Sequence, residues 1–181
     1  MARSLLLSLL VRQRMALQGR FQARYPHPWL IWEAGAWNVP ETDMQNVAAT
    51  RLPVSDLRDC LPPGDALCFE LVPPPSAQAV LRVGRATHNE FVINDATVSR
   101  EHILLAVDAQ GQWRVEAHPK AGSVKLDGVP LAAGQPHPLK PEMHLELGDA
   151  RLTFQGPEEF SARLGRIAAR LTEQMGQARG L

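Results

Sequence analysis

Hydrophobic positions along the chain change their spacing twice. Between residues 3 and 24, apolar side chains recur at intervals close to multiples of a helical turn, with arginine and glutamine between them. This spacing predicts a basic N-terminal helix, which the prolines at 26 and 28 end. The apolar positions of the predicted helix are Leu6, Leu10, Leu17 and Phe21.

From residue 66 to residue 156 the apolar residues fall into short segments separated by turn residues. Short segments at close spacing, with no helical pattern between them, predict an antiparallel β-sandwich or barrel. Glycine beside Asp or Gln in DAQGQ (108–112) and LDGVP (126–130) predicts hairpin turns. The predicted strands are ALCFELV, AVLRVGR, FVIND, HILLAVD, WRVEAH, SVKL, HLEL and ARLTF.

After Pro157 the spacing becomes helical again. Pro157 suits a first helical turn, and the acidic pair that follows suits the positive end of a helix dipole. We expect this amphipathic helix to pack on the β-domain, and a coiled-coil contact with a second chain is the alternative, so oligomerisation through the terminal helices stays open. Its apolar stripe consists of Phe160, Leu164, Ile167, Leu171 and Met175.

These patterns divide the chain into three parts. Residues 1–65 are predicted to be an N-terminal extension, with the helix, a short aromatic hairpin in WLIWEAGAW (29–37) and a loop over 38–65 that is rich in turn residues. Residues 66–156 are the β-domain. Residues 157–181 are the C-terminal helix.

Charge and cysteine content narrow the function classes. The 19 basic residues balance the 19 acidic ones, so no overall field attracts nucleic acid or an anionic membrane, and any phosphate recognition must be local. The start MARSLLLSLLVRQRM resembles a secretory signal, but arginines follow the apolar run at once and that run is too short for a membrane span. With Cys60 and Cys68 outside any CxxC spacing, we expect a cytoplasmic protein with reduced thiols.

Catalytic and metal sites find little support in the sequence. No GxSxG, P-loop, HExxH or kinase motif occurs, and the six histidines have no paired ligand spacing within one element. Ser99 and His102 are three residues apart and would point to opposite faces of a strand, which argues against a nucleophile and its base. We therefore expect no enzyme activity, no metal and no cofactor.

Phosphate binding explains more of the polar residues between 84 and 102. Gly84 and Arg85 follow the predicted strand AVLRV, so a permanently charged guanidinium stands at a loop edge. Ser99 beside Arg100 supplies a hydroxyl donor and a second cation. Two loops of a sandwich can bring such donors together around a phosphate.

The whole segment GRATHNEFVINDATVSREH resembles the signature of forkhead-associated (FHA) domains. The resemblance continues through KLDGVPL and HLELGDARLTF and covers about residues 66–156. It implies a mainly β fold, an antiparallel FHA-like β-sandwich of eleven strands, here with N-terminal and C-terminal helical extensions. It also implies that loops at one end bind phosphothreonine peptides.

The resemblance assigns roles to individual residues. Arg85 would clamp the phosphate, Ser99 would hydrogen-bond it, and Arg100 would line the rim. The residues that would build the loops are Gly84, Asn94, Asp95, His102, Asp127 and Gly128.

One part of the family pattern is missing. Family members carry a Ser/Thr-x-Asn-Gly-Thr segment whose Asn grips the peptide main chain, and here the corresponding span is PKAGSVKLDG. The Asn position falls on Gly122 and the preceding one on Ala121, so Ser123 is the nearest candidate to replace the missing donor.

Two functions follow from this mixture. In the first, the protein is a phosphothreonine-peptide-binding module in signalling, whose partner is a phosphorylated substrate of a Ser/Thr kinase or the kinase itself. In the second, it is a degenerate FHA scaffold that binds partners without phosphate through PWLIWEAGAW and the C-terminal stripe. The loop at 119–124 distinguishes them, because a side-chain donor that reaches the pocket of Arg85 and Ser99 favours binding and an occluded pocket favours the scaffold.

Overall fold

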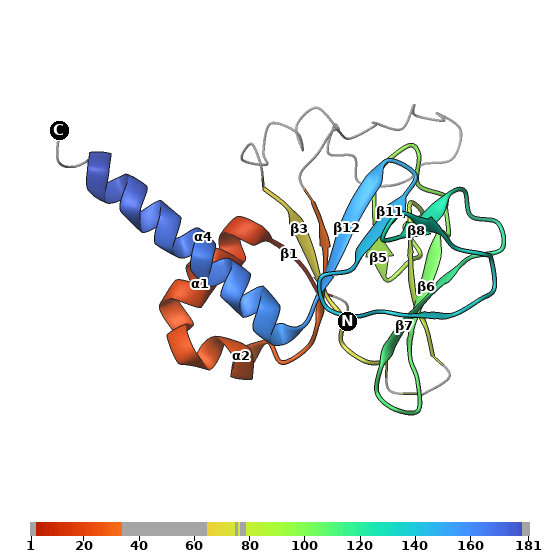
Figure 1. The fold of residues 1–181 in the computed structure, drawn as a ribbon, viewed down its shortest axis with the longest axis horizontal. Helices are drawn as coiled ribbons and strands as arrows, with labels where there is room; N and C mark the ends of the chain where they lie inside the picture. Colours follow the sequence, from red (N-terminus) through yellow and green to blue (C-terminus); the bar gives the residue numbers. More distant parts are fainter. Residues whose placement is uncertain (1–2, 34–64, 75, 77–78, 179–181) are drawn as a thin grey trace.

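Two β-sheets packed face to face form the body of the protein, and a layer of helices covers the outer face of the larger sheet (Figure 1). The computed structural model describes residues 3–33, 65–74, 76 and 79–178. Residues 38–64 of the predicted loop, with Cys60, and Trp37 before them lie outside the described residues. The predicted β-sandwich with helical extensions is confirmed.

The larger sheet has seven strands and the smaller one five. Neighbouring strands are antiparallel, except for the parallel pair β4 and β5. In sheet order, the larger contains β1 (Arg3–Leu6), β3 (Leu67–Glu70), β2 (Trp29–Trp32), β12 (Ala150–Gln155), β11 (His144–Leu147), β8 (Val124–Leu126) and β9 (Val129–Pro130). The smaller contains β10 (His137–Pro138), β7 (Trp113–Ala117), β6 (Ile103–Val107), β4 (Leu81–Gly84) and β5 (Phe91–Val92).

Alternation along the strands builds the core between the sheets. In β7, Trp113, Val115 and Ala117 are buried while Arg114 and Glu116 between them are partly exposed. This period of two places apolar side chains on the inner face of each sheet. The eight predicted strands of residues 66–156 all occur, and the short β9 and β10 are additional.

Strand β2 is buried on both of its faces. Leu30 and Trp32 point into the core between the sheets, whereas Trp29 and Ile31 point to the helical layer. The strand lies between β3 and β12 inside the larger sheet. The aromatic segment WLIW is therefore a central strand, and the sheet extends beyond residues 66–156 into the part predicted as an extension.

The N-terminal helix begins later than its spacing predicts. Residues 3–6 form the edge strand β1, whose backbone pairs with β3. Helix α1 (Leu7–Leu17) follows directly, and its first amide donates to the carbonyl of Ala66 at 2.9 Å. The prediction of a helix from residue 3 is wrong because pairing with β3 satisfies the backbone of these residues in an extended form.

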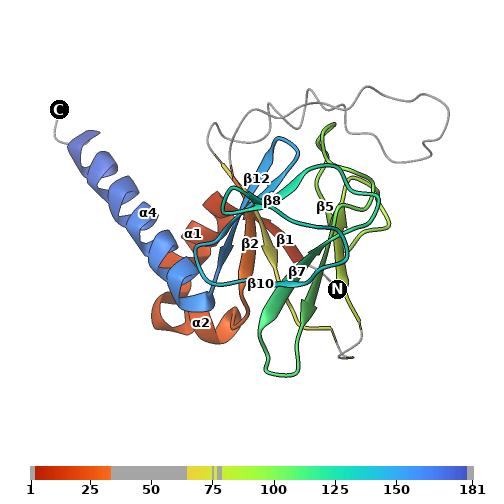
Figure 2. The same cartoon turned by 45° about the vertical axis from the view of Figure 1, so that its right-hand side comes forward.

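Helix α4 (Pro157–Ala178) crosses α1 on the outer face of the larger sheet (Figures 1 and 2). Phe160 and Leu164 are fully buried there, and the Phe160 ring stacks on Trp29 at 4.8 Å between centroids. The short helices η1 (Gln18–Arg20) and α2 (Phe21–Arg24) complete the layer. The second half of α4 projects beyond the layer, and its Leu171 is 45% exposed.

The structure also bears on the thiols and on membrane-spanning segments. Cys68 is a free, buried cysteine on β3, and burial raises the pKa of its thiol, which keeps it protonated. Among the described residues, no helix is both long enough and apolar enough to cross a bilayer.

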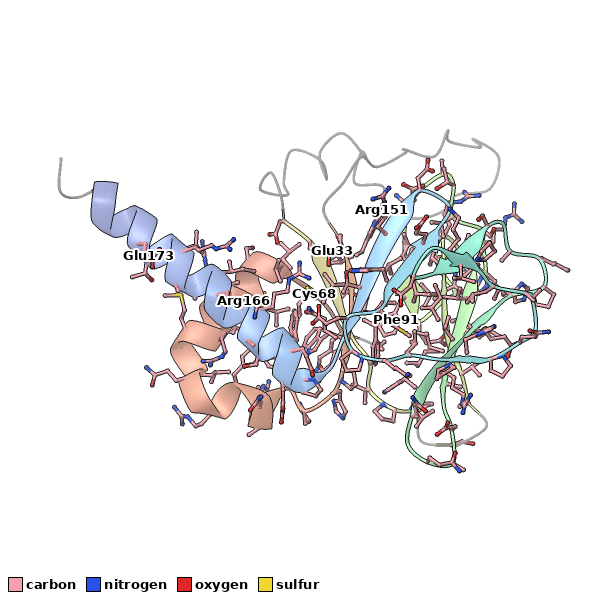
Figure 3. The ribbon with its side chains drawn as sticks, viewed as in Figure 1. Glu33, Cys68, Phe91, Arg151, Arg166 and Glu173 are labelled. Atoms are coloured by element: carbon pink, nitrogen blue, oxygen red, sulfur yellow. The ribbon has the colours of Figure 1, made fainter. Side chains whose placement is uncertain are left out.

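An ion pair fastens α4 to the end of β2. Both terminal nitrogens of Arg163 donate to the carboxylate of Glu33, at 2.7 and 2.8 Å (Figure 3 labels Glu33). Burial of Glu33 favours its neutral form, but hydrogen bonds from Arg163 and Thr153 outweigh burial and lower the pKa of the carboxyl below 4.5.

We predict that Arg163→Gln lowers the free energy of unfolding at pH 7 by about 1–3 kcal/mol, because it leaves a partly buried carboxylate without its bidentate partner. The folded pKa of Glu33 lies below its unfolded value, so this contribution is present above about pH 4.5 and is lost as the pH falls through the folded pKa. Urea unfolding of both forms at pH 7 and pH 3.5 measures the difference at each pH.

Arg166→Gln is the matched control, because Arg166 is an exposed arginine on the same helix with no ion pair among the described residues. We expect it to change the unfolding free energy by less than about 0.5 kcal/mol. Equal losses for the two variants, or a loss for Arg163→Gln that does not shrink at pH 3.5, would contradict the role of the ion pair.

Candidate functional site

Three loops meet at one end of the smaller sheet. They connect β4 to β5, β5 to β6, and β7 to β8. The amides of Arg85 and Ala86 donate to the carbonyls of Ser99 and Arg100 at 2.9 and 3.0 Å, which joins the first two loops. The amide of Gly122 donates to the Ser99 hydroxyl oxygen at 2.9 Å, which joins the third. Ser99 therefore lies at the centre of the loop end.

Gly84 allows the first two loops to approach each other. A Cβ atom at this position would lie 2.4 Å from the carbonyl oxygen of Arg100 and 2.9 Å from that of Ser99. Real Cβ atoms do not come so close to backbone atoms, so any side chain would force the loops apart. The absent side chain at Gly84 thus sets the distance between Arg85 and Ser99.

Arg85 has most of its donors available. Its Nε donates to the carbonyl of Val98 at 3.2 Å, which fixes the base of the guanidinium. Its two terminal nitrogens have no hydrogen-bond partner among the described residues, and the side chain is partly exposed. Arg100 is exposed, and within the described part of the chain its side chain has no ion pair. The guanidinium groups of Arg85 and Arg100 are therefore available to bind an anion.

A hydrogen bond from the third loop orients the Ser99 hydroxyl. Because its oxygen accepts the amide of Gly122, its own O–H remains free to donate to a ligand. The main-chain N–H of Ser99 donates to Nδ1 of His102 at 2.8 Å. The imidazole therefore contacts the backbone of Ser99, and this geometry does not make a nucleophile and base pair.

His102 is fully buried and connects two loops. Nδ1 accepts from Ser99, so Nε2 carries the proton and donates to the carbonyl of Ser123 at 3.1 Å. Burial lowers the pKa of the imidazole, against a smaller opposing effect of the Ser123 hydrogen bond. His102 is thus a neutral side chain that fixes the main chain on both sides of the site.

At residue 122, where the family pattern has an Asn side chain, the third loop has a glycine, and its contacts with the site are made by main-chain groups. Gly122 is exposed, and a Cβ atom added to it would lie 3.7 Å from the Ser99 hydroxyl oxygen, which is ordinary van der Waals contact. Ser123 is exposed and uses its carbonyl, which accepts from His102 and from Gly148. Its hydroxyl has no hydrogen bond among the described residues.

The other residues singled out in the sequence lie in turns around this end. The carboxylate of Asp95 is buried and accepts the amide and hydroxyl of Thr97 at 2.8 and 2.7 Å, while Asn94 before it is exposed. Asp127 and Gly128 form the turn between β8 and β9, with φ of 48° and 80°. Asp127 also accepts the amide of His144 at 2.8 Å. Asp127 therefore supports the start of β11, and among the described residues it makes no hydrogen bond with Ser99.

Two features at the loop end were not predicted. The side chain of Asn89 donates to the carbonyls of Ala86 and Arg100, at 2.8 and 2.6 Å. Glu101 accepts a hydrogen bond from His88 and lies within ion-pair distance of His118, one histidine in each neighbouring loop. The position of Asn89 just before a short strand could have indicated its role. No local spacing connects Glu101 with His88 and His118, so the sequence could not indicate that cluster.

The site has the composition of an anion site without a metal. In the described part of the chain, no group of three His, Cys, Asp or Glu side chains is arranged to hold a metal ion. The unpaired donors are guanidinium N–H groups and one hydroxyl, which are the groups that bind phosphate and carboxylate.

Comparison with known proteins gives one family match. The FHA-domain family model matches residues 81–148, which contain the three loops and the strands that carry them. No curated protein matches the chain significantly.

Several solved structures show local similarity. Mycobacterium tuberculosis EmbR, in complex with a low-affinity phosphopeptide, is 25% identical over 42% of this chain and 20% of its own, with a TM-score of 0.38. The MEK1 FHA domain, in complex with a phosphothreonine peptide of HOP1, is 20% identical over 49% and 87%, with a TM-score of 0.41. The FHA domain of an Arabidopsis thaliana hypothetical protein is 19% identical over 72% and 86%, with a TM-score of 0.47.

The chain spans only a fifth of the EmbR chain. The family match, the motif GRATHNEFVINDATVSREH and the two-sheet sandwich all point to the same conclusion. Residues 81–148 of the chain therefore match the forkhead-associated (FHA) domain family.

Proposed function

We propose that this protein is a non-enzymatic module that binds phosphothreonine peptides through the loop end described above. The observation that supports it best is the pair of free donors at Arg85 and Ser99, held by main-chain hydrogen bonds between their loops. A phosphate group accepts several charge-assisted hydrogen bonds and carries nearly two negative charges at pH 7. Arg85 would clamp it, the Ser99 O–H would donate to it, and Arg100 would line the rim.

The proposed partner is a protein that carries phosphothreonine, either a substrate of a Ser/Thr kinase or the kinase itself, in a cytoplasmic signalling pathway. FHA structures in complex with phosphopeptides, such as those of EmbR and MEK1, support a phosphoprotein partner. Because the chain has no net charge, binding would depend on local complementarity at the loop end.

The site has fewer groups to bind the peptide main chain than to bind the phosphate. The amide of Gly122 is already used on Ser99, and residue 122 has no side chain to hold the peptide backbone. Loss of one positioning hydrogen bond costs about 1–3 kcal/mol, or roughly tenfold in affinity. We therefore expect phosphate-dependent binding of modest strength.

The alternative is an FHA scaffold that binds partners without phosphate through its flanks. In the described part of the first flank, Trp29–Trp32 is a buried central strand and offers little surface. The exposed part of α4 near Leu171 is the remaining feature in its favour. The three predictions below distinguish the two functions.

We predict that Arg85→Ala abolishes binding of a phosphothreonine peptide, with a loss of at least about a hundredfold, because it removes the charged donor at the phosphate. Fluorescence anisotropy with one peptide in phosphothreonine, phosphoserine and unphosphorylated forms measures it, and we expect only the first to bind. Arg114→Ala is the matched control, because Arg114 pairs with Asp108 at the opposite end of β7.

Equal affinity for all three peptide forms would reject phosphothreonine recognition. Indifference to Arg85→Ala would reject the assigned clamp. Either result would favour the scaffold.

Ser99→Ala should weaken phosphothreonine binding about five- to twentyfold. The variant loses the O–H that would donate to phosphate and the oxygen that accepts from Gly122, while Arg85 keeps its contacts. Titration calorimetry at low and moderate salt measures the loss, and the affinity of both forms should fall as salt rises. An unchanged dissociation constant for Ser99→Ala would remove Ser99 from the site.

We predict that Gly122→Asn increases affinity for the phosphothreonine peptide by about tenfold. The space at residue 122 accepts a Cβ, and an amide side chain there would supply the peptide contact that glycine lacks. Gly19→Asn is the matched control, since it makes the same change in open space, at a glycine without a positive φ, in η1 of the helical layer. An affinity that Gly122→Asn leaves unchanged would mean that the third loop does not face the peptide.

A further inference from the structure

A carboxylate held between two imidazoles lies beside the proposed phosphate pocket. His88 Nε2 is 2.7 Å from Glu101 Oε1, and His118 Nε2 is 3.1 Å from Glu101 Oε2. The three side chains come from three different loops, and we refer to them as the His-Glu-His bridge. Glu101 is two residues from Ser99, so their Cα atoms are at most about 7 Å apart, within the Debye length of about 8 Å at physiological salt.

The two histidines are held in different ways. His118 is 20% exposed, and its Nδ1 accepts the amide of Lys120 at 3.2 Å, a contact that requires an unprotonated Nδ1. His88 is 55% exposed, and its Nδ1 has no partner among the described residues. The free Nδ1 of His88 can therefore hold a second proton while Nε2–H keeps its hydrogen bond to the Glu101 carboxylate.

The carboxylate itself stays charged. The hydrogen bond from His88 lowers the pKa of the Glu101 carboxyl below 4.5, against a smaller effect of desolvation. With both imidazoles neutral the His-Glu-His bridge has one negative charge, and it becomes neutral when His88 takes up a proton. Histidine is the side chain that ordinarily changes charge between pH 5 and 8.

The other ionisable groups near the His-Glu-His bridge do not compensate for this change. Arg82 adds a positive potential at Glu101, but it is itself paired with Glu90 at 3.0 Å. His102 is buried and neutral. Besides Glu101, the charged residues on the three loops and on strands β4 to β7 beside them are Arg82, Arg85, Glu90, Asp95, Arg100, Arg114, Glu116 and Lys120.

We propose that the His-Glu-His bridge is a pH-sensitive rim of the phosphopeptide site, in which protonation of His88 cancels the charge of Glu101 and strengthens binding of the phosphate dianion. This inference rests on the proposed function. Glu101 is then a residue that tunes affinity through charge, and it does not itself contact the phosphate. If the bridge only fastened the loops, it would make the same contacts, but the pH dependence of peptide binding would be the same in wild type and in the His88 variant.

The test compares the dissociation constant of one phosphothreonine peptide at pH 8 and pH 6 for the full chain and two variants. The peptide's own titration is the same in every arm and cancels in the ratio of variant to wild type. We expect His88→Asn to equal wild type at pH 8 and to bind about two- to threefold more weakly at pH 6, an effect of the size that Coulomb's law gives at this distance with screening. We expect Glu101→Gln to bind about two- to threefold more tightly than wild type at pH 8.

The outcomes separate this inference from the function on which it rests. Binding that depends on Arg85, with a ratio of His88→Asn to wild type that is the same at both pH values, would overturn the pH-sensitive rim alone. Weaker binding by Glu101→Gln at pH 8 would identify a purely structural fastening and would also overturn it. Absence of phosphothreonine binding at both pH values would overturn the proposed function and the rim together. His27→Asn is the control, because it removes another imidazole paired with a carboxylate, Glu70, outside the three loops.

Discussion

The backbone of Gly84 lies against the carbonyl groups of Ser99 and Arg100, and the loop end depends on this close approach. The approach allows two main-chain hydrogen bonds, from Arg85 and Ala86, to hold the loops together without any side chain. Side chains then attach around this centre, with Asn89 and His102 satisfying the remaining main-chain groups. The free donors of Arg85 and Ser99 are rigid because the backbone beneath them is rigid, which lowers the entropic cost of holding a ligand.

The sequence predicted the fold most accurately where the residues of a strand alternate between apolar and polar and a short turn follows. Strands such as β6 and β7 alternate inward and outward residues and are joined by a short turn, so both their type and their pairing could be predicted. The edge strand β1 was taken for helix, because RSLL continues the leucine spacing of the helix that follows. Its extended form depends on pairing with β3, a partner that no local pattern identifies.

The site divides in the same way. Arg85 and Ser99 were singled out because the motif that contains them is contiguous, and the structure places them on joined loops. The hydrogen bond from Gly122 to Ser99 and the His-Glu-His bridge each connect loops that are distant in the sequence. Such contacts arise from tertiary approach, so neither the residue types nor their spacing could predict them.

The central position of β2 has a consequence for the order in which the protein folds. This strand is synthesised well before β12, one of its two neighbours in the sheet, because more than a hundred residues separate them. Until then, an apolar strand that is buried on both faces in the final structure has an open edge and lacks the cover of α4. Pairing over such a distance along the chain is slow, and an exposed apolar edge favours aggregation. The nascent chain therefore passes through a stage in which its N-terminal strands need protection, and release of a chain that stops before β12 would leave that stage permanent.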